Sequence, residues 1–172
     1  MQELFMGYIP TKNKVPLTRF KGGKNLITLE EAQKLDEYAG LLAEDTILVD
    51  IDEEKTSEII ADILDELNVN CRITKTTRGR HFYFKGGNIH KSGSHLRLAI
   101  GVEGDIKVGS ANSIALLKFN GVERFIEWDN GVYDAVPDWL IPVRTKTDFT
   151  TMEAGDGSNQ ELFNYILTLQ NA

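Results

Sequence analysis

The chain has 172 residues, the length of one domain, and its 41% of hydrophobic residues suffices for a single core. It contains no run of about 18 apolar residues and no basic segment followed by an apolar stretch, so the sequence predicts a soluble, cytoplasmic protein without a membrane partner. Cys71 is the only cysteine, which excludes an intramolecular disulfide and a cysteine-based zinc cluster.

The net charge of -7 is unevenly distributed along the chain. Acidic residues are absent from 4–29 and from 67–102, and both segments are rich in lysine and arginine. Clustered cations of this kind attract a phosphate backbone even when the whole chain is acidic. Alternatively, the acid-free windows arise by chance on solvated loops and strand edges. On the first interpretation, the expected nucleic-acid contacts are Lys12, Lys14, Arg72, Lys75, Lys85 and Arg97.

The first predicted element is a helix from Thr28 to about Tyr38, because Thr28 and Glu31 form a capping-box pattern and Gly40 follows as a stop signal. Residues 41–52 form an apolar, β-branched run, which predicts one strand or a short hairpin. A second helix is indicated by apolar residues at spacings of three and four, namely Ile59, Ile60, Ile63, Leu64 and Leu67.

From Cys71 onward the period changes to that of strands. Six segments are separated by Gly, Asn and Ser: CRITKT, HFYFK, LRLAI, GDIKVG, SIALLKF and VERFIEW. They predict an α+β domain with a mixed, mainly antiparallel sheet and helices on one face. The pattern stops near Pro137, so we place this domain at 1–143, a polar linker at 144–157 and the start of a helical segment at 158–172. The chain is then a fragment of a longer protein, or its last helix packs on its own core.

A pair of carboxylates carries the first chemical signal. Asp50 and Asp52 stand two positions apart at the end of an apolar strand, so both point to one face. Adjacent carboxylates repel each other unless a hard cation such as Mg2+ or Mn2+ balances them. Asp-x-Asp alone also serves phosphatases, Toprim domains and sugar-nucleotide transferases, or marks a solvated strand end. Asp105, which alternates with Ile106, is either a third carboxylate of the site or a turn residue after Gly104.

The segment KTTRGRHFYFK is a candidate phosphate grip. Gly79 lets the backbone approach a ligand, and His81 begins a strand with Arg78 and Arg80 beside it. A histidine with arginines can donate charge-assisted hydrogen bonds to a triphosphate, although a lone histidine is more often structural. Tyr83 is either a stacking partner for a base or a buried residue. The other two histidines lie in a glycine- and serine-rich stretch and are given no metal role.

The order DID, TRGRHFYF and GDIKVGS resembles the three motifs of the archaeo-eukaryotic primase superfamily, and in particular its bacteriophage and plasmid primase-polymerase (Prim-Pol) branch. The similarity covers nearly the whole chain. GYIPTKNKVPLTRF looks like the opening segment of that family, PDWLIP like its closing segment, and GDGSNQELFNYILTLQ like the start of the region that joins phage primases to a helicase. The resemblance implies a fold with an RRM-like catalytic unit, and a protein of the bacterial host cytoplasm.

The resemblance further implies a DNA primase and polymerase that transfers nucleotides on a template by a two-metal mechanism. Asp50, Asp52 and Asp105 match the acids that bind two Mg2+ or Mn2+ ions, and these residues together with His81 would be catalytic. The implied nucleotide-binding residues are His81, Arg80, Lys107, Arg78 and Thr77. Gly79 stands where the family usually has serine, and Thr76 or Thr77 would have to supply the missing hydroxyl. The implied partners are single-stranded DNA, a primer, NTP or dNTP, and a C-terminal helicase region of the same polypeptide.

Two other classes remain open. One is a non-catalytic module of a replication protein that binds nucleic acid or nucleotides, and the three intact acids count against it. The other is a metal-dependent phosphatase or nuclease that uses the same aspartate pair, which would not require a separate triphosphate grip.

Overall fold

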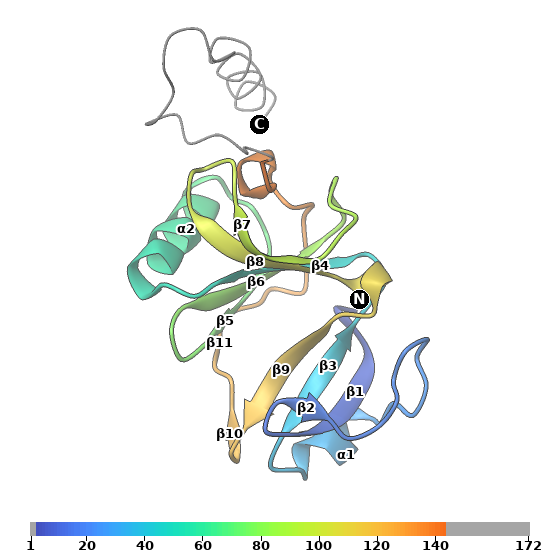
Figure 1. The fold of residues 1–172 in the computed structure, drawn as a ribbon. Helices are drawn as coiled ribbons and strands as arrows, with labels where there is room; N and C mark the ends of the chain where they lie inside the picture. The colour runs from blue at the N-terminus through green and yellow to red at the C-terminus, as the bar shows by residue number, and fades with distance from the viewer. Residues whose placement is uncertain (1–2, 144–172) are drawn as a thin grey trace, which may run out of the picture.

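Two antiparallel sheets dominate residues 3–143, the part of the chain that the computed structural model describes (Figure 1). The five-stranded sheet contains, in spatial order, β10 (Val122–Glu123), β9 (Ile114–Phe119), β3 (Tyr38–Leu42), β1 (Phe5–Lys12) and β2 (Val15–Pro16). The six-stranded sheet contains β11 (Ile126–Trp128), β5 (Arg72–Lys75), β6 (Arg80–Lys85), β4 (Thr46–Ile51), β8 (Glu103–Val108) and β7 (Gly93–Arg97). The predicted α+β class with mainly antiparallel pairing is thereby confirmed.

Two α-helices and two short 3-10 turns complete the described chain: α1 (Leu29–Gln33), α2 (Glu54–Glu66), η1 (Gly109–Ala111) and η2 (Asp138–Leu140). No helix within residues 3–143 has the length and apolar character needed to cross a bilayer. The linker and helical segment predicted for 144–172 lie outside the described residues.

The first helix is capped as predicted but ends early. Thr28 Oγ1 accepts a hydrogen bond from the Glu31 amide at 3.3 Å, and Glu31 Oε2 accepts one from the Thr28 amide at 2.9 Å. The predicted extension to Tyr38 is wrong, because Tyr38 begins β3. Gly40 lies inside that strand rather than after a helix. A Cβ there would come within 2.4 Å of the Phe5 ring on β1, so Gly40 permits this close approach of two strands.

The apolar run 41–52 is neither one strand nor a hairpin. It covers the end of β3 and all of β4, and these strands belong to different sheets. Every residue of β3 is buried, as are the first four of β4, because each strand has a packed layer on both faces. VERFIEW is divided in the same way, between β10 and β11.

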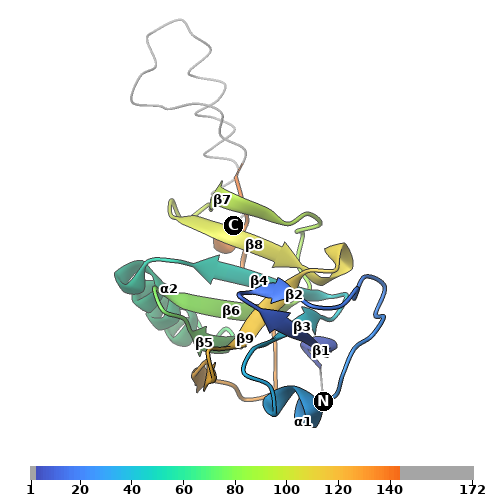
Figure 2. The same ribbon diagram turned by 60° about the horizontal axis from the view of Figure 1, so that its bottom comes forward.

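The six-stranded sheet has a different covering on each face, as Figures 1 and 2 show. On one face, Val49 and Phe82 pack in a core with Ile60 of α2. The predicted apolar stripe of this helix is therefore confirmed, although Ile59 at its margin is 58% exposed. On the other face, Leu48, Tyr83 and residues of the five-stranded sheet form a second core. The inter-sheet core ends where polar residues replace these apolar ones, and the candidate site lies there.

Candidate functional site

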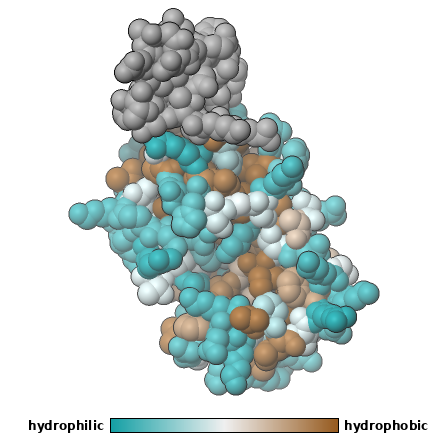
Figure 3. Space-filling view, in the orientation of Figure 1, coloured by the Kyte–Doolittle hydropathy of each residue, from teal (hydrophilic) through white to brown (hydrophobic). Residues whose placement is uncertain are grey.

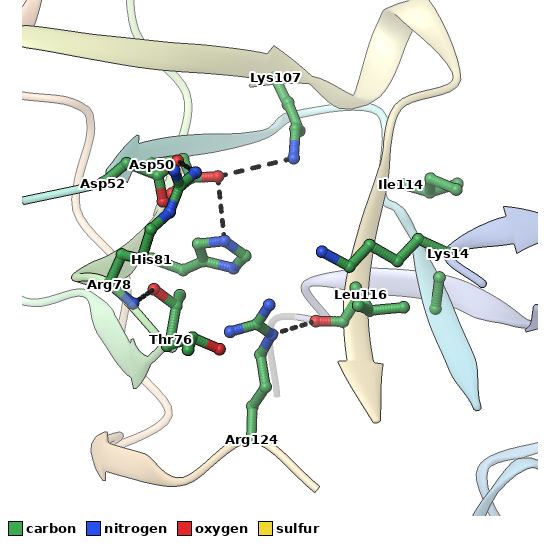
Figure 4. A pocket seen from close by; sticks show the side chains of 12 residues that line it. Lys14, Asp50, Asp52, Thr76, Arg78, His81, Lys107, Ile114, Leu116 and Arg124 are labelled. Atoms are coloured by element: carbon green, nitrogen blue, oxygen red, sulfur yellow. Dashed lines mark hydrogen bonds and ion pairs between the residues drawn. The ribbon is translucent and has the colours of Figure 1, made fainter. Parts of the chain in front are cut away.

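A pocket of about 290 Å³ opens between the two sheets (Figure 4). Twelve residues line it: Lys14, Ala39, Asp50, Asp52, Thr76, Thr77, Arg78, His81, Lys107, Ile114, Leu116 and Arg124. Figure 4 shows the amines of Lys14 and Lys107 and the guanidinium of Arg124 turned toward the pair formed by Asp50 and His81. The Asp50 carboxylate of β4 therefore faces cations that come from three other parts of the chain.

Strand register brings the three sequence motifs together. Asp50 is directly paired with His81 across β4 and β6, and with Asp105 across β4 and β8. Directly paired residues of antiparallel strands point to the same face, so all three side chains stand on the face toward the five-stranded sheet. Lys107, two residues further along β8, shares that face and lies 3.8 Å from Asp50 Oδ2. The Asp105 carboxylate lies just outside the pocket and accepts the backbone N–H of His95 at 2.9 Å.

His81 links Asp50 to the buried core. Its Nε2 lies 3.1 Å from Asp50 Oδ2, and its Nδ1 lies 3.2 Å from the hydroxyl of Tyr83. Burial raises the pKa of Tyr83, which is fully buried, so its hydroxyl keeps its proton. Because the ionised Asp50 carboxylate can only accept a hydrogen bond, Nε2 carries the proton of the neutral ring and donates to Asp50, and Nδ1 accepts from the Tyr83 hydroxyl. The alternative role of Tyr83 as an exposed stacking partner is wrong, because the core covers the ring.

The protonation states of this pair follow from their surroundings. Burial lowers the pKa of His81, and this effect outweighs the opposing influence of Asp50. Burial alone would raise the pKa of Asp50, but the hydrogen bond from His81 and the cations Lys107 and Arg124 outweigh it and lower that pKa. Near neutral pH, a neutral imidazole therefore holds an ionised carboxylate.

Asp52 and Arg78 form an exposed ion pair at the rim of the pocket. Arg78 belongs to the turn between β5 and β6, where the Thr76 hydroxyl accepts the amide of Gly79 at 3.0 Å. A Cβ at Gly79 would lie 1.8 Å from the carbonyl oxygen of Ile51. The usual serine of the primase family therefore cannot stand at this position without moving β4 or the turn. Thr77, the other hydroxyl considered, lines the pocket.

Within residues 3–143, the pocket contains one buried carboxylate oxygen without a hydrogen-bond partner. Asp50 Oδ1 is buried and has no hydrogen-bond partner among the described residues. An unpaired carboxylate oxygen in a buried position is costly, and a hard cation would satisfy it. As the side chains stand, no three His, Cys, Asp or Glu residues within 3–143 are grouped closely enough to hold a metal. The carboxylate oxygens of Asp50 and Asp52 are of the kind that Mg2+ and Mn2+ prefer.

Arg80 is not brought to the pocket. It precedes His81 on β6 and therefore points to the opposite face, where its side chain is only 8% exposed. Its guanidinium donates to both carboxylate oxygens of Glu127, at 2.6 and 3.1 Å, and to the Ser57 hydroxyl at 3.0 Å. These contacts join β6, β11 and α2, so the Arg80 side chain connects elements of the fold and does not face the pocket.

The six cations predicted to contact nucleic acid are dispersed. Lys14 lines the pocket, and Lys75 lines a neighbouring one while pairing with Glu54 at 2.6 Å. Arg72 lies 3.7 Å from Asp129, and Lys85 pairs with Asp45. Lys12 and Arg97 are exposed at strand ends away from the pocket.

Sequence reasoning missed four residues of the pocket, namely Ala39, Ile114, Leu116 and Arg124. Ile114 and Leu116 form its apolar wall, and Arg124 donates from Nε to the Leu116 carbonyl at 3.0 Å. The two apolar residues had a signal, because the strand 114–119 is apolar at both odd and even positions and so predicts packing on both faces. Arg124 had none, because its position depends on where the chain crosses from one sheet to the other.

Comparisons of the chain with protein-family models, with curated proteins and with solved structures found no match. The structure therefore defines the chain as an α+β protein of two packed antiparallel sheets, with a pocket of mixed charge between them.

Proposed function

We propose that the chain is a template-dependent nucleotidyltransferase of the primase-polymerase kind. The observation that carries the proposal is the meeting of Asp50 and Asp52 with cations in one pocket, the cations being Lys14, Arg78, Lys107 and Arg124. A nucleoside triphosphate is strongly anionic and needs such cations, whereas a divalent metal needs carboxylate oxygens. One pocket offers both.

The arrangement of the six-stranded sheet also supports the proposal. Its four central strands occur along the chain in the order β4, β5, β6 and β8, with α2 between β4 and β5. In the sheet they stand in the order β5-β6-β4-β8. This arrangement agrees with the RRM-like unit that the resemblance to primases implies. His81, Asp50 and Asp105, one residue from each motif, stand in one row across β6, β4 and β8, although they are separated in sequence.

The residues divide into three roles under this proposal. Asp50, Asp52 and Asp105 would hold Mg2+ or Mn2+; when bound, these ions would supply activation of the primer hydroxyl and neutralisation of the leaving pyrophosphate. Arg78 and Lys107 would bind the triphosphate and orient it against the primer terminus. His81 would hold the Asp50 carboxylate in position, since both of its ring nitrogens are already engaged.

Primer extension on a single-stranded template tests the proposal, with NTPs and dNTPs supplied in separate reactions with Mn2+ or Mg2+. The wild type is expected to extend the primer, and Asp50→Asn/Asp52→Asn is expected to abolish extension. Asp62→Asn is the matched control, because this acid is exposed on α2 across the sheet from the pocket. Wild-type activity that survives the double substitution would overturn the proposal.

Two other results would point to the remaining classes. Template binding by a folded wild type that never extends a primer would favour a non-catalytic binding module. Degradation of the primer or release of phosphate would favour a nuclease or phosphatase. Cation binding is measured independently of activity, because a cation that binds the folded state raises the melting temperature. We expect Mn2+ to raise it in the wild type and in Asp62→Asn, but not in Asp50→Asn.

A further inference from the structure

A second pocket, of about 720 Å³, opens directly beside the first. The two share five lining residues, namely Lys14, Thr76, Thr77, Arg78 and Arg124. Beyond them the second pocket extends past Phe119 of β9 and Val122 of β10 to Phe125. The two pockets are therefore continuous. The second one, which we call the groove, leads away from the carboxylates.

Phe125 is an exposed aromatic side chain on a fixed backbone. Phe125 is 70% exposed, yet its backbone carbonyl accepts a hydrogen bond from the Lys75 amide of β5 at 2.8 Å. The preceding residue, Arg124, donates its amide to the Leu117 carbonyl of β9, also at 2.8 Å. This short segment thus spans both sheets, and its backbone is held from each side. A rigid aromatic ring facing solvent can bind a planar partner with little loss of conformational freedom.

The walls of the groove are mainly positive. Neither Lys14 nor Arg124 forms an ion pair with a carboxylate within residues 3–143. The Nζ of Lys14 lies 5.2 Å from the centroid of the Phe119 ring, which places a cation over an aromatic face. Glu123 is the acid among the lining residues, and it accepts a hydrogen bond from Tyr38 at 3.3 Å. Figure 3 shows apolar and hydrophilic side chains interleaved over the five-stranded sheet.

We infer that this second pocket is the groove that holds a single nucleic-acid strand, with its phosphates on Lys14 and Arg124 and one base stacked on Phe125. The inference rests on the proposed function, because it explains how a template would reach the first pocket. Cations combined with an exposed ring suit this occupant, since a single strand presents both phosphates and unpaired bases. An acidic peptide would use the cations but would leave Phe125 without a planar partner.

Fluorescence anisotropy with a labelled oligo-dT strand tests the groove without requiring catalysis. Phe125→Ala and Phe125→Leu are both expected to weaken binding roughly fivefold or more, because leucine keeps the apolar surface but cannot stack. Trp128→Ala is the matched control, since this residue is 54% exposed and lies outside both pockets. Lys14→Gln is expected to reduce the slope of log affinity against log salt by about 0.7, the value for one phosphate contact on a single strand. Because Phe125 is exposed, neither substitution of it should change the melting temperature.

The outcomes separate the groove from the proposed function. Equal binding by Phe125→Ala and the wild type, or no binding by the wild type, would overturn the groove. Unchanged binding by Phe125→Ala in a protein that extends primers would rule out the groove as the strand-binding site but would not contradict the proposed function. Weakened binding by both variants of Phe125 in a protein that never extends primers would keep the groove and remove the polymerase.

Discussion

His81 and Asp50 are directly paired in the register of β6 and β4, and Nε2 of His81 lies 3.1 Å from Oδ2 of Asp50. Tyr83, two residues along β6 on the same face, donates to the other ring nitrogen. The line of hydrogen bonds therefore runs from the inter-sheet core to the pocket. It fixes one oxygen of the Asp50 carboxylate and leaves the other, Oδ1, without a partner among the described residues.

Tyr83→Phe tests this line of hydrogen bonds by removing one hydroxyl. We expect the free energy of unfolding to fall by about 1–2 kcal/mol, because Nδ1 of His81 loses its donor in a buried position. Urea denaturation measures the change. Tyr8→Phe is the matched control, since the Tyr8 hydroxyl makes no hydrogen bond among the described residues and its loss should cost little. Equal effects of the two substitutions would show that the bond to His81 contributes nothing.

The sequence predicted the six-stranded sheet better than the five-stranded one. Strands such as β8 alternate apolar and polar residues, because one face is packed and the other reaches the site. β1 contains Gly7 and Pro10 and shows no such period, so it was not recognised. β3 is buried on both faces, and its first residue, Tyr38, was assigned to a preceding helix. Two-sided burial removes the periodic signal on which the prediction depends.

The candidate site could be predicted where strand periodicity alone determines it. The period of two predicts that Asp105 and Lys107 share one face of their strand, and the pairing of β8 with β4 places both beside Asp50. The same period, applied to β6, places the side chains of Arg80 and His81 on opposite faces of the sheet. Treating Gly79, Arg80 and His81 as one motif led us to assign Arg80 to the pocket as well. The place of Arg124 in the pocket could not be predicted, because it depends on the hydrogen bond of its amide to the Leu117 carbonyl in the five-stranded sheet.

Gly79→Ser introduces the residue that the primase motif resembled by this segment usually has, and we expect it to destabilise the fold by about 2 kcal/mol or more. The added Cβ would meet the Ile51 carbonyl oxygen at 1.8 Å, and a backbone atom cannot move aside as a side chain can. Gly93→Ser is the matched control, because a Cβ there meets only the side chain of Leu96, at 3.0 Å. Thermal unfolding measures both variants. A Gly79→Ser protein as stable as wild type would show that the turn and β4 can separate.

Arg80→Lys and Arg78→Lys should have opposite consequences although they are neighbouring, identical changes. Lysine cannot reproduce the two hydrogen bonds that Arg80 makes to Glu127, so we expect Arg80→Lys to lower the free energy of unfolding by about 1–3 kcal/mol. Nucleotide affinity should then be unchanged. Arg78 is exposed and lines the pocket, so Arg78→Lys should weaken nucleotide binding with little effect on stability. Denaturation and nucleotide titration of both variants measure the two effects. If Arg80→Lys weakened nucleotide binding and left stability unchanged, Arg80 would have to be a nucleotide-binding residue.

We expect Cys71 to make the free energy of unfolding fall in alkaline solution. Burial, helped by the nearby charges of Asp134 and Asp129, raises the pKa of its thiol from 9.0 to about 12. Above pH 9 the unfolded thiol loses its proton while the folded one keeps it, so the unfolded state binds fewer protons and stability decreases as pH rises. The loss from this one group is at most about 1.4 kcal/mol for each pH unit between the two pKa values.

Comparison with Cys71→Ala isolates this effect, because the buried tyrosines titrate in both proteins. Urea denaturation at pH 8, 9 and 10 should show the two stability curves running parallel from pH 8 to 9 and converging above pH 9, as the wild type declines more steeply. The substitution also removes a buried sulfur, which shifts the whole curve without changing its slope. Curves that stay parallel through pH 10 would mean that water reaches the thiol in the folded protein, and that Cys71 does not lie in a sealed core beneath α2.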